Sequence, residues 1–125
     1  MIAIDASAAY QLLFDEHADA LIARHGGLTA PDFIVCELLN ARWKAQRAAA
    51  PAPDLDFVID FVGLIELEPN ISHAAEAAEL AERLDHPIYD CFYLAVARAR
   101  RVKLLTSDER LTRKLRAHKM SGLLV

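Results

Sequence analysis

Residues 86–97 read HPIYDCFYLAVA, an apolar run that contains a single acid, Asp90. Asp90 follows Pro87 by three residues, and proline favours the first turn of a helix, so we expect Asp90 near a helix start. The helix dipole stabilises an acid there by roughly 0.3–1 kcal/mol, less than the several kcal/mol that removing a carboxylate from water costs. We therefore expect the Asp90 carboxylate to be exposed, paired, protonated or facing a cation.

Outside this stretch, short apolar runs alternate with helical patterns along the chain. The expected strands are 1–5, 28–31, 63–69, 103–107 and a final strand at 121–125. The expected helices are 7–16, 17–25, a long helix that opens at Pro31, 54–62, 72–84 with Ser72 as its cap, 87–101 and 108–118. This alternation predicts a short parallel sheet covered on both faces, a three-layer α/β/α sandwich. The length predicts a single domain over residues 1–125.

The composition is that of a globular protein, with 54% hydrophobic and 26% charged residues. No apolar run approaches the ~20 residues of a membrane span, and no basic segment precedes the first apolar run, so we expect neither a membrane anchor nor a signal peptide. Cys36 and Cys91 are isolated thiols, which favours a reducing, cytoplasmic setting. The absence of C-x-x-C argues against zinc.

The charge is unevenly distributed along the chain. The net charge of −4 argues against a generic nucleic-acid coating, yet nine of the 14 basic residues lie between positions 98 and 119. Only two acids share that window, Asp108 and Glu109. The basic segment is either a solvated helix face or a surface that contacts phosphates.

Three more acids occupy positions as unusual as that of Asp90. Asp5 ends the first strand and Asp108 follows a late one, and the carboxyl ends of parallel strands meet at one edge of a sheet. Glu37 interrupts the apolar run FIVCELL near the start of its helix. Each acid also has an ordinary explanation, since Asp5 and Asp108 are good helix N-caps and Glu37 could be solvated or salt-bridged.

Four carboxylates in one pocket would repel one another. Two unit charges 4 Å apart cost about 4 kcal/mol at an effective dielectric near 20. Either the pKa values rise, or a divalent cation lies among the carboxylates. An all-oxygen site suits Mg²⁺ or Mn²⁺. A metal site together with a basic patch suggests phosphodiester hydrolysis.

Four segments in order resemble one family of nucleases: MIAIDAS (1–7), VCELLNA (35–41), HPIYDCFYLAVA (86–97) and LLTSDERL (104–111). The chain resembles PIN-domain ribonucleases over nearly its whole length. It is most similar to the VapC-type toxins of type II toxin–antitoxin pairs. The resemblance implies a parallel sheet between helices and metal-dependent endonucleolytic cleavage of RNA.

Carried over residue by residue, the resemblance implies that the catalytic, metal-binding acids are Asp5, Glu37, Asp90 and Asp108, with Mg²⁺ or Mn²⁺ as the cofactor. Ser7 and Thr106 match small hydroxyl positions beside the first and last acids. These two hydroxyls would hydrogen-bond the carboxylates or a metal-bound water, or serve as local cap or turn residues.

The resemblance also implies partners: a VapB-type antitoxin, an RNA substrate and a second copy in a homodimer. The candidate phosphate contacts are Arg42, Lys44, Arg47, Arg110 and Arg113. Trp43 would stack on a base or pack at an interface.

Other functional classes fit less well. A receiver-like phosphoacceptor domain needs an acid pair after the first strand and a lysine that ends a late strand, but Asp5 stands alone and Lys103 precedes its strand. A dehalogenase-type phosphatase needs D-x-D where this chain has Asp5-Ala6-Ser7. No G-x-S-x-G motif supports a serine hydrolase, and we expect the histidines at surface or capping positions: His17, His25, His73, His86 and His118. A non-enzymatic interaction module remains open.

Overall fold

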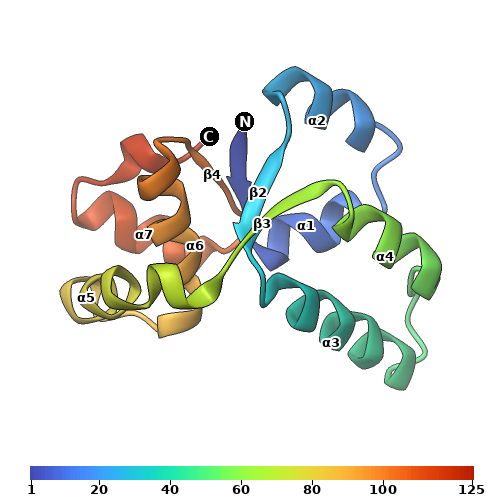
Figure 1. The fold of residues 1–125 in the computed structure, drawn as a ribbon. Coiled ribbons are helices and arrows are strands. Elements are labelled where there is room, and N and C mark those ends of the chain that lie inside the picture. Colours follow the sequence, from blue (N-terminus) through green and yellow to red (C-terminus); the bar gives the residue numbers. More distant parts are fainter.

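The structure is a computed structural model that describes residues 1–125, and its centre is a four-stranded parallel sheet (Figure 1). The strands run in the order β3-β2-β1-β4. Their bounds are β1 Ile2–Ile4, β2 Leu28–Pro31, β3 Ile65–Glu68 and β4 Leu104–Leu105. Every pairing in the sheet is parallel. The predicted α/β sandwich with a short parallel sheet is confirmed.

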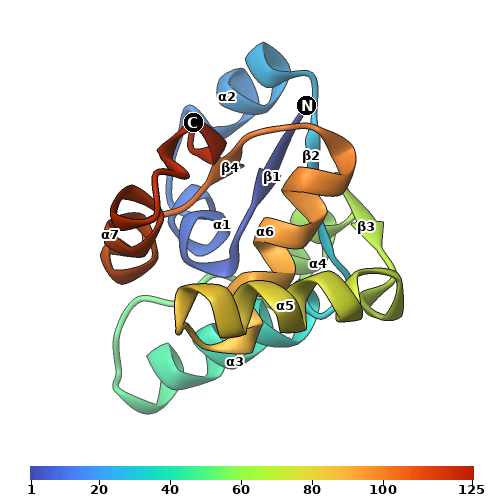
Figure 2. The ribbon, with the colours of Figure 1, turned by 90° about the vertical axis from the view of Figure 1, so that its left-hand side faces the viewer.

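Helices lie on both sides of the sheet (Figure 2). One side carries α1 Ala6–Leu12, α2 Ala18–His25, α3 Ile34–Arg47 and α4 Leu55–Val62. The other side carries α5 Ala74–Leu84, α6 Ile88–Arg100 and α7 Glu109–Ala117, with short 3₁₀ helices η1 Asn70–His73 and η2 Ser121–Leu123. No helix is both long enough and apolar enough to cross a bilayer.

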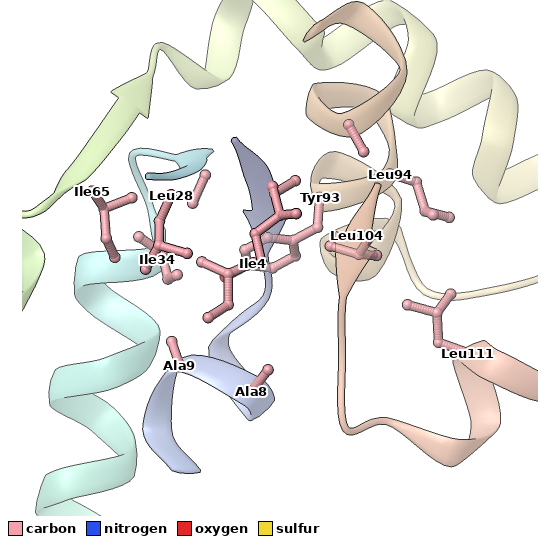
Figure 3. Packing of buried hydrophobic residues seen from close by; sticks show 14 of the residues in the cluster. Ile4, Ala8, Ala9, Leu28, Ile34, Ile65, Tyr93, Leu94, Leu104 and Leu111 are labelled. Atoms are coloured by element: carbon pink, nitrogen blue, oxygen red, sulfur yellow. The ribbon is translucent and has the colours of Figure 1, made fainter. Parts of the chain in front are cut away.

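The core lies between these layers (Figure 3). Ile65, Leu28, Ile4 and Leu104 come from the four strands, and all of them are buried. Every residue of β1 and of β2 is buried, as expected for central parallel strands that helices cover on both faces. On the α6 side the core includes Tyr93, which is 1% exposed.

Several boundaries differ from the sequence prediction. The long helix begins at Ile34, because Pro31 is paired as the last residue of β2. The Ser72 side chain caps nothing, because the 3₁₀ turn η1 precedes α5. The predicted final strand is wrong: residues 121–123 form η2, and only Leu124 bridges to Leu104. A two-residue β4 leaves little strand edge for a fifth strand to pair with.

Candidate metal centre

Asp5 follows β1 directly and is buried at the start of α1. Its Oδ1 accepts the backbone N–H of Ala8 at 2.9 Å and the Ser7 hydroxyl at 2.7 Å. Its Oδ2 accepts the hydroxyl of Thr106, from the end of β4. Asp5 is thus a helix cap, and it also joins the carboxyl ends of the two neighbouring strands β1 and β4.

Asp108 is held by the loop after β4. Its backbone N–H donates to Thr106 Oγ1 at 3.0 Å. Its Oδ1 accepts the N–H groups of Arg110 and Leu111, at 2.9 and 3.1 Å, and so caps α7. The capping interpretation of Asp108 therefore holds, and it places the carboxylate at the edge of the sheet where β1 and β4 end.

Glu37 lies in the first turn of α3 and is held from across the sheet. The Tyr93 hydroxyl donates to Glu37 Oε1 at 2.7 Å. The sequence analysis did not single out Tyr93, because a tyrosine in the apolar face of a helix resembles any other core residue. Only the fold shows that its hydroxyl reaches an acid 56 positions away in the chain.

Asp90 lies in the first turn of α6, as predicted, and its partner is His86. His86 Nε2 lies 2.6 Å from Asp90 Oδ2, within hydrogen-bond distance. The expectation that the histidines are surface or capping residues is wrong for His86, which is buried. His73 is buried too, and it occupies the N-cap position of α5 without a side-chain cap hydrogen bond. His86 precedes α6, which begins at Ile88, so the chain entering the helix brings its ring to Asp90. Their spacing of four residues was the available signal.

We call Asp5, Glu37, Asp90 and Asp108 the acid cluster, because each either raises the pKa of another member or has its own pKa raised by one. Burial raises the pKa of Asp5, Glu37 and Asp90, and neighbouring carboxylates add to each shift. The charge of Asp90 raises the pKa of Asp5, and the charges of Asp5 and Asp90 raise that of Glu37. The charge of Asp108 raises the pKa of Asp90. The four predicted acids are thus electrostatic neighbours, and neither lysine nor arginine takes part in these shifts. Of the four, only Asp90 and Asp108 belong, together with His86, to a group whose ligand atoms all lie within 4.8 Å of one another.

Every member of the acid cluster lies at a helix N-terminus. Asp5 and Asp108 are N-caps, while Glu37 and Asp90 lie in first turns. The positive ends of four helix dipoles offset part of the repulsion, though each contributes only about 0.3–1 kcal/mol. A divalent cation fits this oxygen-rich donor set. The ligand atoms offered by His86, Asp90 and Asp108 lie within 4.8 Å of one another.

The PIN domain family matches the chain over residues 2–116. The chain belongs to the PIN domain family. PIN domains are generally nucleases that depend on Mg²⁺ or Mn²⁺, and the acid cluster provides a possible site for such an ion.

A solved structure has the same fold as this PIN domain. The crystal structure of PAE2754 from Pyrobaculum aerophilum superimposes with a TM-score of 0.69, at 24% sequence identity, over 90% of this chain and 84% of that one. No curated protein matches this PIN domain.

The predicted phosphate contacts fall in different surroundings. Arg110 and Arg113 are exposed on α7, and a hollow of about 410 Å³ lies between Thr106, Arg113 and Arg116. Lys44 lines another hollow beside Glu37.

The other two basic candidates on α3 have partners within the protein. Arg42 Nε donates to the Pro53 carbonyl at 2.8 Å and so fixes the α3–α4 connection. The Arg47 guanidinium lies 5.0 Å from the centre of the Trp43 ring.

Proposed function

We propose that this PIN domain is an endoribonuclease that acts as the toxin of a type II toxin–antitoxin pair. The observation that carries the nuclease proposal is the acid cluster: one buried and three half-buried carboxylates without a lysine or arginine partner, in a chain of a nuclease family. In this proposal Asp5, Glu37, Asp90 and Asp108 hold Mg²⁺ or Mn²⁺. When bound, such an ion stabilises negative charge on a reacting phosphate and lowers the pKa of a coordinated water.

The chain's own part is to hold these carboxylates in fixed positions. The Asp5 carboxylate accepts three hydrogen bonds, from Ser7, Ala8 and Thr106, which leaves it little freedom to rotate. The Tyr93 hydroxyl orients Glu37 in the same way. Ligands that neighbouring groups hold in place bind a cation without first losing side-chain freedom.

Two hollows beside the acid cluster support an RNA strand as substrate. The hollow that contains Arg113 and Arg116 also contains Thr106, whose hydroxyl binds Asp5, so it extends from two guanidinium groups to the edge of the acid cluster and suits a phosphate there. On the other side, a hollow of about 580 Å³ contains Glu37 together with Phe33, Tyr89 and Phe92. Aromatic side chains of this kind stack on unpaired bases, which favours a single-stranded substrate.

The proposed antitoxin partner would occupy an apolar groove formed by the end of α1, α2 and α4. Phe57, Phe61 and Leu64 line this groove, and acids border it: Asp15, Glu16, Asp19 and Asp60. An apolar groove with an acidic border complements an amphipathic segment with basic flanks. We propose a homodimer as well, as the resemblance to the VapC-type toxins implies.

The test is cleavage of a mixed pool of structured RNAs by the purified chain in EDTA, Mg²⁺ and Mn²⁺, beside Asp5→Asn prepared identically. We expect cuts that need the metal and vanish in the variant. Growth arrest on expression in cells, absent for Asp5→Asn, tests the toxin role. If no cuts occur and neither metal shifts the melting temperature, the nuclease proposal fails and the interaction module takes its place.

A further inference from the structure

His86 lies in a short connection that two packed helices hold at both ends. Helix α5 ends at Leu84, and Asp85 caps it in the left-handed conformation, with φ of 48°. The backbone N–H of His86 donates to the Ala81 carbonyl at 3.2 Å, and Pro87 is the N-cap of α6. Since α5 packs along α6, the backbone of His86 is fixed relative to the first turn of α6.

The ring of His86 is buried and makes one polar contact. Its side chain is 2% exposed, and Nε2 lies 2.6 Å from Asp90 Oδ2. Nδ1 is buried and has no hydrogen-bond partner. A proton on Nδ1 would therefore have no acceptor, whereas a proton on Nε2 has a carboxylate oxygen as its acceptor. The ring proton is therefore on Nε2.

This hydrogen bond makes the two oxygens of the Asp90 carboxylate different, because only Oδ2 contacts His86. The carboxylate torsion of an aspartate is broad when nothing fixes it. The Nε2–H of the His86 ring holds Asp90 Oδ2 in place, and Asp90 Oδ1 remains free to bind a cation. Asp108 offers its own oxygen within 4.8 Å of these groups, so an ion beside Asp90 has a second carboxylate in reach.

We propose that His86 is a positioning residue that fixes the Asp90 carboxylate so that Oδ1 faces the divalent cation. This inference rests on the proposed function, because it needs an ion at the acid cluster. It assigns His86 to orientation and not to direct ligation. A metal-binding histidine almost always donates its other ring N–H to an acceptor, and His86 Nδ1 has none.

The chain supplies a matched control in His73. His73 is also buried, with Nε2 unpaired, and its side chain makes no hydrogen bond to a carboxylate. Replacing either histidine by phenylalanine costs similar packing, but only His86→Phe removes a donor from Asp90. His86→Gln keeps an amide N–H near the place of Nε2. His86→Asn is too short to reach Oδ2, so it tests the same loss should His86→Phe fold poorly.

The experiment measures the Mn²⁺ dissociation constant by titration calorimetry for the wild type and the four variants, with circular dichroism and melting in EDTA to verify folding. We expect His86→Phe and His86→Asn to weaken Mn²⁺ binding by 10- to 100-fold, the usual effect of losing a partner that orients a ligand. Cleavage at saturating Mn²⁺ should recover most of the wild-type rate. His86→Gln should stay within about threefold of wild type, and His73→Phe should bind Mn²⁺ as the wild type does.

Three results would overturn the inference. If His86→Phe and His86→Asn bind Mn²⁺ with the dissociation constant of the wild type, the positioning role of His86 is refuted and the metal site remains. A nitrogen hyperfine coupling to bound Mn²⁺ in the wild type, lost in both variants, makes His86 a direct ligand. A wild-type chain that binds no Mn²⁺ refutes the metal site, and the inference with it.

Discussion

The molecule holds two groups of carboxylates in opposite electrostatic surroundings. In the acid cluster, burial and neighbouring carboxylates raise the pKa of Asp5, Glu37 and Asp90. On β3, Glu66 and Glu68 accept hydrogen bonds from Arg100 Nη1 at 2.8 and 3.1 Å. There the bond and charge of Arg100 lower the pKa of Glu66. We call these three residues the β3 ion pairs.

The difference lies in where the compensating cation comes from. Arg100 supplies it within the chain for Glu66 and Glu68, at the exposed edge strand of the sheet. The acid cluster has hydroxyl and imidazole donors, and no lysine or arginine shifts the pKa of Asp5, Glu37 or Asp90, so its charge is compensated mainly by protons or by an ion from solution. Activity and metal dependence should therefore follow the acid cluster and leave the β3 ion pairs unaffected.

The largest expected effect is that of Asp5→Asn. Because the amide oxygen of asparagine still caps α1, the variant should fold. It should lose metal-dependent RNA cleavage by more than about 100-fold, beyond the usual effect of removing an outer hydrogen-bond partner. Gel assays of RNA cleavage in Mn²⁺ measure it. Glu66→Gln, which removes the same charge from the β3 ion pairs, is the control. Equal activity loss in both variants would erase the distinction between the two groups.

The second-largest expected effect is that of Tyr93→Phe. The ring keeps its place in the core, but Glu37 loses the hydroxyl that orients it. We expect the rate at limiting Mn²⁺ to fall by about 10- to 100-fold. The matched control is Tyr10→Phe, because the Tyr10 hydroxyl is buried without any hydrogen-bond partner. Equal rates for Tyr93→Phe and the wild type at limiting Mn²⁺ would show that Glu37 needs no orientation.

A smaller effect concerns stability and pH. A carboxyl whose pKa is raised on folding binds its proton more tightly in the folded state. Its stabilising contribution is complete below the unfolded pKa, near 4, and is lost as pH rises through the raised folded pKa. For Asp5, Glu37 and Asp90 the metal-free melting temperature should therefore fall as pH rises from 4 towards neutrality.

Calorimetric melting in EDTA measures this slope, and excess Mn²⁺ should reverse it at neutral pH. Asp90→Asn removes one charge while its amide oxygen can still accept the His86 N–H. This variant should melt higher than the wild type in EDTA at neutral pH and gain less from Mn²⁺. A variant that melts lower than the wild type in EDTA would show that the carboxylates do not repel one another.

The smallest expected effect belongs to the β3 ion pairs. Arg100→Met should leave cleavage unchanged and lower the melting temperature slightly at low salt, because exposed ion pairs contribute little and salt screens them. The difference from wild type should vanish in high salt. For Glu66, whose pKa is lowered, the contribution is present at neutral pH and is lost as pH falls through the folded value, the opposite of the acid cluster.

Much of the fold was predictable from local patterns. Pro87, the apolar periodicity after it and the Gly26-Gly27 stop place α6 and the end of α2 correctly, since these signals act within one or two turns. The errors in the predicted elements occur where contacts with other parts of the fold determine the local structure. Residues 121–125 have the composition of a strand, but β4 offers too short an edge. Ser72 is a good cap by type, yet the preceding turn η1 occupies its place.

The sequence by itself determined which acids are out of place in apolar surroundings, because burying a charge is costly in any fold. It also determined the alternation of strands and helices that brings strand ends to one edge. Only the tertiary structure decided which side chains hold those acids. The Tyr93 hydroxyl comes from a position 56 residues away from the carboxylate that it binds, and no local pattern encodes such a pair. The bonds from Ser7 and Thr106 to Asp5, by contrast, agree with what the family resemblance implied. The burial of His86 likewise depends on α5 packing against α6.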